Sequence, residues 1–371
     1  MQVPLLDLKA QFQSLREPIL SAVEQTLSSG SWILGPTVER LELALSERLA
    51  VKSSVGVASG TDALLLALKA VDVGHGDEVI LPTFTFFATA GAVVNCGATP
   101  VFVEMEDDSF NLDPADVERA ITPRTKAIIA VHLFGQSAAL APIHAVALRH
   151  GIPVIEDAAQ AIGATYGSTP VGGVTELGCF SFYPTKNLGA AGDGGLVTSN
   201  DTRLAERVRL LRNHGMQPRY YHHEVGTNSR LDAVQAAILL VKLGRLDDWA
   251  AARARNAAAY SAAFAAEADL RPPLDTGVGT HVWNQYTLRL RRPGRDALRA
   301  YLSERGIGTE IYYPVPLHQQ PCFRHLGYED GRFPRSEEAA QSCLSLPIFP
   351  EMTGEQQGHV IDSIRTWLRT A

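Results

Sequence analysis

Lysine and cysteine are scarce in this chain of 371 residues, which holds six lysines and four cysteines. The cysteines show no CxxC or Cys/His spacing, so the sequence excludes a zinc-finger type of site, and we expect no bound metal. We interpret all four as buried thiols in a reducing compartment. Long apolar runs are also missing. None reaches the roughly 18 residues that a membrane-spanning helix needs, which excludes a transmembrane protein.

An excess of positive charge is absent as well. The chain has 33 basic and 40 acidic residues, for a net charge of −7, and no basic stripe, so we expect no nucleic-acid partner. At the N-terminus, Asp7 and Lys9 interrupt the apolar stretch that a signal peptide requires, and we expect a cytoplasmic protein with no membrane partner. No G-x-G-x-x-G follows the first predicted strand, which excludes a Rossmann dehydrogenase.

The length favours two domains, because a single core rarely organises so many residues. Up to residue 246, short β-branched runs alternate with helical patterns, which predicts a large α/β domain, residues 1–246, with a mostly parallel sheet. We assign residues 247–371, which include the Pro/Gly-rich break RPPLDTGVGT, to a smaller α+β domain, on which residues 1–20 can pack. The predicted strands of the large domain span residues 54–58, 78–81, 99–103, 127–132, 153–156, 179–182 and 195–198.

Of the six lysines, Lys186 has the most distinctive surroundings. It lies in SFYPTKNLGAAGDGG, where an apolar strand ends, a proline forces a turn, and four glycines let other groups approach the backbone closely. A lysine in a glycine-rich loop is often an ordinary surface residue. The residues that follow the other predicted strands favour a different role for Lys186, as the amine that forms a Schiff base with pyridoxal phosphate.

Asp157 ends the run HGIPVIED, at the carboxyl edge of a predicted parallel strand, where open α/β sheets bind ligands. A pyridoxal phosphate site needs an acidic partner for the ring nitrogen, and this carboxylate is the candidate. Gln160 follows three residues later, and we expect it to hydrogen-bond the phenolic oxygen of the cofactor. The alternative is that Asp157 only caps the following helix.

The segment ASGTDALLLAL is the candidate phosphate site. Gly60 permits close approach, Thr61 offers a hydroxyl and an amide, and the following helix points its positive end at the site. Ser181, on the strand before Lys186, is a second candidate phosphate donor. Ser-Gly-Thr before a helix is also a common simple cap, so this motif is not decisive by itself.

Phe84 lies in LPTFTFFAT, at the end of another predicted strand. We expect its ring to stack on the pyridine ring, although an aromatic residue at this place can equally belong to the core.

Taken together and in this order, these segments resemble the DegT/DnrJ/EryC1/StrS family of nucleotide-sugar aminotransferases over nearly the full length. The segments that carry the resemblance are PLLDLKAQF, SWILGP, SGTDAL, GDEVILPTFTF, VHLFGQ, PVIEDAAQ, SFYPTKNLGAAGDGG and GTNSRLDAVQAAIL. The resemblance implies the type I, aspartate aminotransferase-like fold of pyridoxal-phosphate enzymes. It also implies pyridoxal 5'-phosphate as the cofactor, pyridoxamine 5'-phosphate as its intermediate form, and L-glutamate as the amino donor.

The resemblance assigns roles to the matching positions. Lys186 and Asp157 become the catalytic residues. The implied cofactor-binding residues are Gly60, Thr61, Phe84, Asp157, Gln160, Ser181, Lys186 and Asn228. Asn228 implies a homodimer with shared active sites, because in the family this asparagine reaches the phosphate of the neighbouring subunit. Arg230, in the same segment, is a further substrate-binding candidate, and the alternative is an ordinary solvated charge.

The segment IYYPVPLHQQPCF supplies three further substrate-binding candidates, Tyr312, Tyr313 and His318. It resembles members of the family that act on 3-keto sugars more than those that act on 4-keto sugars. The predicted reaction therefore makes a 3-amino sugar from a dTDP- or UDP-linked ketone, for polysaccharide or glycoside biosynthesis. The three residues can equally be packing residues of a proline-rich loop.

Three alternatives remain beside this prediction. The first is a 4-keto-sugar aminotransferase of the same family. The second is a sugar dehydratase, a small branch that has histidine in place of the lysine, and Lys186 argues against it. The third is a non-catalytic regulator, which nothing in the sequence supports, since no motif of the set is missing.

Overall fold

A seven-stranded sheet forms the centre of the computed structural model, which describes residues 1–370. The strand order is β1-β9-β8-β5-β4-β2-β3, in which β9 runs antiparallel to both of its neighbours and the other neighbouring pairs are parallel. The strands are β1 (Ser53–Val57), β2 (Glu78–Pro82), β3 (Thr99–Val103), β4 (Thr125–Val131), β5 (Val154–Asp157), β8 (Leu177–Ser181) and β9 (Gly195–Ser199). The predicted α/β fold with a mostly parallel sheet is confirmed, and every predicted strand overlaps an observed one.

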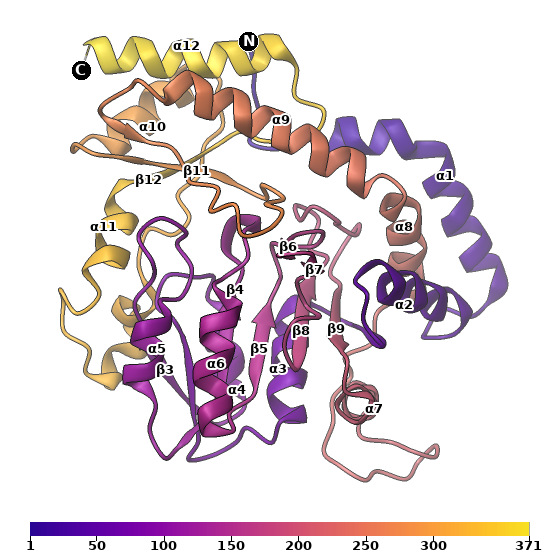
Figure 1. Cartoon of the computed structure of the whole chain (residues 1–371). Coiled ribbons are helices and arrows are strands. Elements are labelled where there is room, and N and C mark those ends of the chain that lie inside the picture. Colours follow the sequence, from indigo (N-terminus) through magenta and orange to yellow (C-terminus); the bar gives the residue numbers. More distant parts are fainter. Residues whose placement is uncertain (371) are drawn as a thin grey trace.

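Helices cover both faces of this sheet (Figure 1), because the strands alternate apolar side chains between the two faces. Ile129, for example, packs on one side and Ile128 on the other. The first face is covered by α3 (Gly60–Ala70), α4 (Ala88–Asn95) and α7 (Thr202–Leu211). The second face is covered by α2 (Pro36–Arg48), α5 (Pro114–Ala120), α6 (Leu140–His150) and α8 (Ala233–Leu243).

A second, smaller sheet follows in the C-terminal part of the chain. Its antiparallel strands are β10 (Leu270–Arg271), β11 (Tyr286–Leu290) and β12 (Cys343–Leu346). The helices that accompany it are α9 (Leu246–Phe264), α10 (Arg295–Glu304) and α12 (Gly354–Thr370), at the top of Figure 1. The boundary that we assign between residues 246 and 247 falls at the start of α9, and it stays a proposal.

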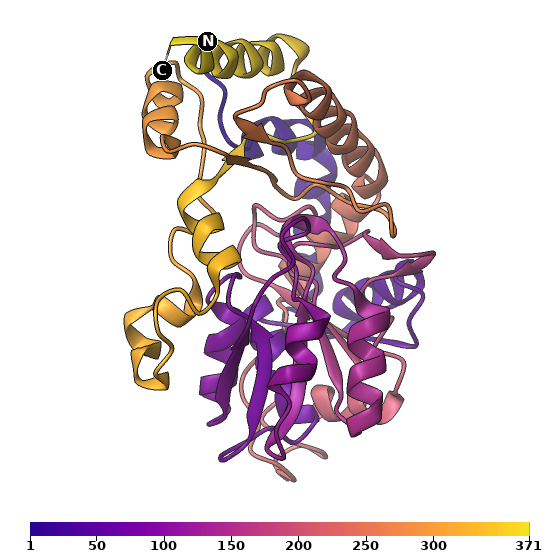
Figure 2. The ribbon, with the colours of Figure 1, turned by 60° about the vertical axis from the view of Figure 1, so that its left-hand side comes forward.

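The segment from η2 (Leu317–Gln319) through η3 (Pro321–Leu326) to α11 (Pro334–Ser342) returns toward the large sheet. It runs down beside β3, the edge strand, as both views show (Figures 1 and 2). The hydroxyl of Tyr328 accepts a hydrogen bond from the backbone N–H of Phe102 on that edge, at 3.1 Å. The C-terminal part of the chain thus covers one edge of the large sheet as well as its top.

The N-terminal residues divide between the two parts of the molecule. Val3 pairs with Ile307, next to α10, and its N–H donates to the carbonyl oxygen of Gly306 at 2.8 Å. The helix α1 (Leu8–Ser29) then packs on α8 through Leu15 and Ile19. A short hairpin and a single 3-10 turn complete the part of the chain built around the large sheet: β6 (Thr165–Tyr166), β7 (Thr169–Pro170) and η1 (Leu133–Gly135).

All four cysteines carry free thiols. Cys179 and Cys343 are buried and Cys96 is half-buried, but Cys322 is exposed, so the interpretation of four buried thiols is wrong at that position. Cys322 lies in η3, on the outer side of the segment that covers the sheet edge. None of the helices formed by residues 1–370 has the length and apolarity needed to cross a membrane.

Candidate active site

The predicted site residues gather at the carboxyl ends of the parallel strands. Asp157 is the last residue of β5 and Ser181 is the last residue of β8. Gly60 begins α3 just after β1, and Phe84 follows β2. Parallel strands present their carboxyl ends on one edge of the sheet, which is where open α/β sheets bind ligands.

Asp157 is buried, with 5% of its surface exposed. Its carboxylate accepts hydrogen bonds from the Thr89 hydroxyl at 2.8 Å and from the Ala159 N–H at 3.2 Å. Burial raises the pKa of this carboxyl, and these two bonds and the charge of Lys186 offset the effect only in part. Within residues 1–370, no basic side chain forms an ion pair with the Asp157 carboxylate. A protonated ring nitrogen would supply such a cationic partner.

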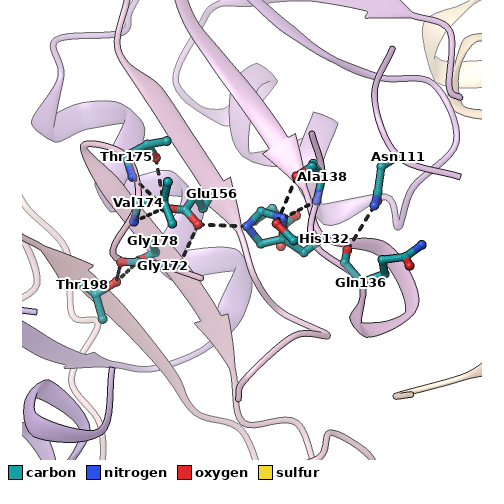
Figure 3. A network of polar contacts seen from close by, with 12 residues as sticks. Asn111, His132, Gln136, Ala138, Glu156, Gly172, Val174, Thr175, Gly178 and Thr198 are labelled. Carbon is teal, nitrogen blue, oxygen red and sulfur yellow. Dashed lines mark hydrogen bonds and ion pairs between the residues drawn. The ribbon is translucent and has the colours of Figure 1, made fainter. Parts of the chain in front are cut away.

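On the opposite face of β5, Glu156 is the centre of a buried polar network (Figure 3). Its carboxylate accepts three backbone N–H bonds, at 2.6, 3.0 and 2.9 Å, from Gly172, Val174 and Thr175. His132 Nε2 lies 3.0 Å from the same carboxylate, and because the Ala138 N–H donates to His132 Nδ1, Nε2 carries the proton. These hydrogen bonds tie Glu156 to His132 and to the loop of residues 172–175, and they thereby fix β5, the strand that ends in Asp157.

Lys186 lies in the turn after β8, where its backbone N–H donates to the Tyr183 carbonyl at 2.9 Å. Burial lowers the pKa of its amine to about 8, although the Asp157 carboxylate raises it in part. Across residues 1–370, no side chain or carbonyl forms a hydrogen bond or ion pair with its Nζ. A lysine with a lowered pKa and a free amine beside a buried carboxylate has the properties of a Schiff-base nucleophile.

Gly60 and Ser181 meet where α3 begins. A Cβ atom on Gly60 would lie 2.6 Å from Ser181 Cβ, so glycine is required for this close approach. The side chain of Ser59 caps the helix by accepting from the Asp62 N–H at 3.1 Å, whereas the backbone N–H groups of Gly60 and of the exposed Thr61 form no hydrogen bond within residues 1–370. This is the arrangement of a helix-terminal phosphate site.

Gln160 joins the site through both ends of its amide. Its Oε1 accepts from the Phe134 N–H at 2.7 Å, and its Nε2 donates to the Tyr313 hydroxyl at 3.2 Å. One Nε2 hydrogen stays available for a ligand oxygen. Burial raises the pKa of Tyr313, so its hydroxyl is neutral and can accept from Gln160.

Phe84 is placed differently from the expectation. Its side chain is fully buried and packs against Phe110 and Tyr313, with centroid distances of 5.9 Å in both cases, so neither ring face is open to a ligand. Two residues later, Phe86 is 58% exposed, and its ring lies 6.3 Å from that of Tyr313. The ring available for stacking in this loop is therefore that of Phe86.

His318 is also placed away from an open site. Its side chain is buried, with Nδ1 2.7 Å from the Thr83 hydroxyl and Nε2 3.3 Å from Glu337. Burial lowers its pKa, which the nearby Glu337 offsets in part. These contacts place His318 between the β2 loop and α11, and its role as a substrate residue stays a prediction.

The remaining predicted residues lie apart from the ring position. Tyr312 is half-buried next to Tyr313, at a centroid distance of 5.8 Å. Asn228 is exposed, in the segment that leads to α8. Arg230 is not a solvated charge, since its guanidinium donates to Asn213 Oδ1 at 2.8 Å and its Nε is buried without a partner.

Besides Phe86, three residues of the site were not found from the sequence. Thr89 holds Asp157, Tyr183 is 53% exposed beside the Lys186 turn, and Asn187 is buried directly after Lys186. The spacing of ATA around Thr89 gives no signal of its own. Tyr183 and Asn187, however, lie within the motif SFYPTKN, and that position is a signal that points to them.

The collected residues fit pyridoxal phosphate. A Cβ-free position for close approach and free helix amides suit the phosphate, Asp157 suits a protonated ring nitrogen, and the free amine of Lys186 suits the aldehyde. An exposed aromatic ring, Phe86, is available to stack on the pyridine ring. Each requirement of the cofactor therefore has a matching group at this edge of the sheet.

Comparison with known proteins gives a consistent result. The DegT/DnrJ/EryC1/StrS aminotransferase family matches residues 13–365. A solved structure of S. venezuelae DesV in complex with a ketimine intermediate superimposes with a TM-score of 0.96 at 44% identity, and the match covers 99% of this chain and 98% of that one.

Three curated relatives match over nearly their whole lengths. A pleiotropic regulatory protein of Geobacillus stearothermophilus is 49% identical, over 100% of this chain and 99% of its own. A dTDP-3-amino-3,4,6-trideoxy-alpha-D-glucose transaminase of Streptomyces venezuelae is 44% identical, over 99% and 96%. A UDP-N-acetyl-3-dehydro-alpha-D-glucosamine 3-aminotransferase of Acidithiobacillus ferrooxidans is 46% identical, over 99% and 98%.

Proposed function

Because this chain belongs to the DegT/DnrJ/EryC1/StrS aminotransferase family, we propose that it transfers the amino group of L-glutamate to C3 of a nucleotide-linked keto-sugar. The protein is a pyridoxal 5'-phosphate-dependent aminotransferase with the type I fold. The proposed product is a dTDP- or UDP-linked 3-amino sugar for polysaccharide or glycoside biosynthesis. The observation that carries the proposal is the free amine of Lys186 beside the buried Asp157, in a chain whose relatives include two 3-amino-sugar transaminases.

Bound pyridoxal phosphate supplies an aldehyde that exchanges amino groups and a ring that accepts the electron pair released when a Cα–H bond breaks. The Lys186 amine would hold the cofactor through its aldehyde and, when free, would act as the base and acid that moves a proton at the reacting carbon. Asp157 keeps the ring nitrogen protonated. Thr89 and the Ala159 N–H hold that carboxylate in place.

The other cofactor contacts follow from the placement of the residues. The phosphate binds at Gly60, Thr61 and Ser181, where α3 and β8 meet. The free Nε2 hydrogen of Gln160 donates to the phenolic oxygen, and Phe86 stacks on the ring in place of Phe84. These assignments are supported by burial and by hydrogen-bond geometry.

The sugar binds near Tyr312, Tyr313 and Arg230. The Tyr313 hydroxyl is oriented by Gln160. Arg230 uses Nη1 for its bond to Asn213, and its Nη2 forms no hydrogen bond in residues 1–370, so Nη2 can donate to a phosphate or hydroxyl oxygen. Specificity for C3 depends on how such groups hold the sugar hydroxyls, since the rejected sugars leave buried polar groups unpaired.

We also propose a homodimer with shared active sites. Asn228 is exposed next to the buried Ser229, which is tied to the start of α3 because its hydroxyl donates to Asp62 at 2.8 Å. From there Asn228 can reach the phosphate site of a second copy. We also propose a cytoplasmic location, which the four free thiols support.

Two alternatives keep the fold. A 4-keto-sugar aminotransferase would use the same cofactor residues and differ only at the sugar. The alternative of a regulator without catalysis is supported by the name of the Geobacillus relative. Against it, this chain has the Lys186 amine, the Asp157 carboxyl group and the phosphate site at Gly60. A dehydratase is disfavoured because Lys186 occupies the position of the histidine.

The experiment is a two-step reaction. The purified protein is loaded with pyridoxal phosphate and treated with L-glutamate, and the excess donor is removed. Nucleotide-linked 3-keto and 4-keto sugars are then offered separately, with Lys186→Ala as the control. Return of the original cofactor absorbance with 3-keto sugars alone supports the proposal. Return with 4-keto sugars alone contradicts the assigned position, and failure of glutamate to change the absorbance contradicts the donor.

A further inference from the structure

A short segment of the small domain, residues 282–284, lies between the two arms of the cofactor site. It precedes β11, and its members Val282, Trp283 and Asn284 are all buried. The Gln160 arm consists of the turn of residues 133–135 and of Gln160, which accepts a hydrogen bond from that turn. The Lys186 arm is the turn after β8 that contains Lys186 and Asn187. We call residues 282–284 the bridging segment.

The bridging segment contacts the Gln160 arm through the backbone. The N–H of Val282 donates to the Gly135 carbonyl at 3.0 Å, and the N–H of Asn284 donates to the Phe134 carbonyl at 2.9 Å. The N–H of Phe134 in turn donates to Gln160 Oε1 at 2.7 Å. A Cβ atom on Gly135, which has a φ of +99°, would lie 3.0 Å from the Asn284 nitrogen, so the contact leaves no room for a side chain.

The bridging segment contacts the Lys186 arm through a pair of asparagine amides. Asn187 Nδ2 donates to the Val282 carbonyl at 2.9 Å, and Asn284 Nδ2 donates to Asn187 Oδ1 at 2.8 Å. Both side chains are buried, at 5% and 7% exposed. Because Asn187 directly follows Lys186, these two bonds fix the backbone from which the reactive amine extends.

Arg253 of α9 anchors the bridging segment from behind. Its Nη1 donates to the carbonyls of Ile348, Trp283 and Asn284, at 2.8, 3.2 and 3.4 Å. Burial lowers the pKa of this guanidinium to about 10, so keeping its charge there is costly. The carbonyl oxygens are acceptors that offset this cost.

Packing alone does not account for the two asparagines. An apolar pair of similar volume would fill a buried position at no polar cost, whereas Asn284 Oδ1 is buried without a hydrogen-bond partner in residues 1–370. The two asparagines form directional hydrogen bonds although the Asn284 Oδ1 atom stays unpaired within the described residues. This indicates that the orientation of these side chains matters more than their packing.

We infer that Asn187 and Asn284 are positioning residues, which set the Lys186 amine at a fixed distance from the Gln160 amide through the bridging segment. The inference rests on the proposed roles of Lys186 and Gln160 in holding the cofactor. It makes the small domain part of the catalytic geometry, because a shift of the bridging segment moves both arms. Neither asparagine touches the reacting atoms.

The test compares Asn187→Ala, Asn284→Leu and the double variant with the wild-type protein. Asn284→Leu keeps the side-chain volume and removes the donor, so the core stays filled. Asn256→Ala is the matched control, since it removes a similar bond, from Asn256 Nδ2 to the Phe349 carbonyl at 2.9 Å, and Asn256 forms no hydrogen bond with Lys186, Gln160 or residues 282–284. The readouts are kcat, KM for glutamate, and the pH at which the absorbance of the bound cofactor changes form.

The inference predicts that each single variant lowers kcat by about 10- to 100-fold, with KM changed by less than about threefold. Each also moves the pH of the absorbance change away from the wild-type value, and the double variant is no worse than the poorer single variant within about threefold. Asn256→Ala is expected to leave kcat, the KM for glutamate and the pH of the absorbance change at their wild-type values.

Two results overturn the inference: single variants that match Asn256→Ala in kcat and absorbance pH, or effects that multiply in the double variant. Failure of the proposed function is seen separately. In that case the wild-type protein itself does not bind pyridoxal phosphate or does not respond to glutamate, whatever the variants do.

Discussion

Asp157 and Glu156 are consecutive residues of β5, and their buried carboxyl groups have pKa values shifted in opposite directions. Side chains alternate between the faces of a strand, so the two groups meet different partners. For Asp157, burial raises the pKa, and two hydrogen bonds offset the effect only in part. For Glu156, burial also opposes ionisation, but His132 and the backbone N–H groups outweigh it and lower the pKa. One carboxylate is satisfied by the protein, and the other is left for a ligand.

Glu156→Gln should destabilise the protein. The new amide would turn donor hydrogens toward groups that already donate, and breaking a buried charged network of this kind costs about 3 kcal/mol. Because the pKa of Glu156 is lowered in the folded state, its stabilising effect is present above the ordinary pKa of 4.5 and is lost as the pH falls through the folded value. Urea unfolding at pH 7 and at decreasing pH measures both effects. Equal stability of the variant and the wild type at pH 7 would show that the Glu156 network does not stabilise the folded protein.

Lys186→Met should stabilise the cofactor-free protein. The folded pKa of about 8 lies below the ordinary 10.5, so the unfolded chain binds more protons between these values, and wild-type stability rises over that window. Below pH 8 the amine is charged in the folded and in the unfolded chain, so the whole cost of its partial burial is present. We expect the Tm of the variant at pH 7 to exceed that of the wild type by at least about 2 °C. The difference should shrink from pH 8 toward 10.5, and a difference that is constant with pH would contradict the shifted pKa.

Gly60→Ala should weaken cofactor binding about tenfold or more, since the added methyl group would lie 2.6 Å from Ser181 Cβ and force the phosphate site apart. Gly74→Ala is the matched control, because a Cβ at Gly74 meets nothing within 4 Å. Titration of the cofactor-free proteins with pyridoxal phosphate measures the difference. Equal affinities for the two variants would mean that α3 does not hold the phosphate.

Mixing two inactive variants tests the shared active site. Lys186→Ala and Asn228→Ala damage different subunits of the same site if Asn228 acts on the neighbouring copy. Subunit exchange between them should then restore roughly a quarter of the wild-type activity, because half of the two-fold dimers are mixed and each mixed dimer has one intact site. If no activity returns although exchange is demonstrated, Asn228 acts within its own chain.

Much of the fold could be predicted from the sequence because the parallel strands are short apolar runs buried on both faces. The apolar run of HGIPVIED ends at the acidic residues, which predicts Asp157 at the carboxyl end of a strand, and it is the last residue of β5. Other elements gave weaker signals. α1 contains Pro18, which argues against a helix, and β10 has two residues, too few for any periodicity.

Two site residues could not be placed from the sequence. Phe84 and Phe86 lie just beyond β2, which ends at Pro82, and past that point strand alternation no longer tells which ring is buried. His318 is buried by its contact with Thr83, 235 residues earlier in the chain, and no local pattern reports such a partner. The interpretation of Phe84 as a core residue was an open alternative, and its burial agrees with that alternative.

The most direct test of this account is to find the lysine that holds the cofactor. Reduction of the pyridoxal phosphate-loaded protein with borohydride fixes the cofactor to its amine, and peptide mass mapping then locates it. Lys242 is the informative competitor, since burial lowers its pKa too, but its Nζ already donates to the Gly189 carbonyl at 2.6 Å. We predict that the label lies on Lys186 and is lost in Lys186→Ala. A label on Lys242, or none, would contradict the active site described here.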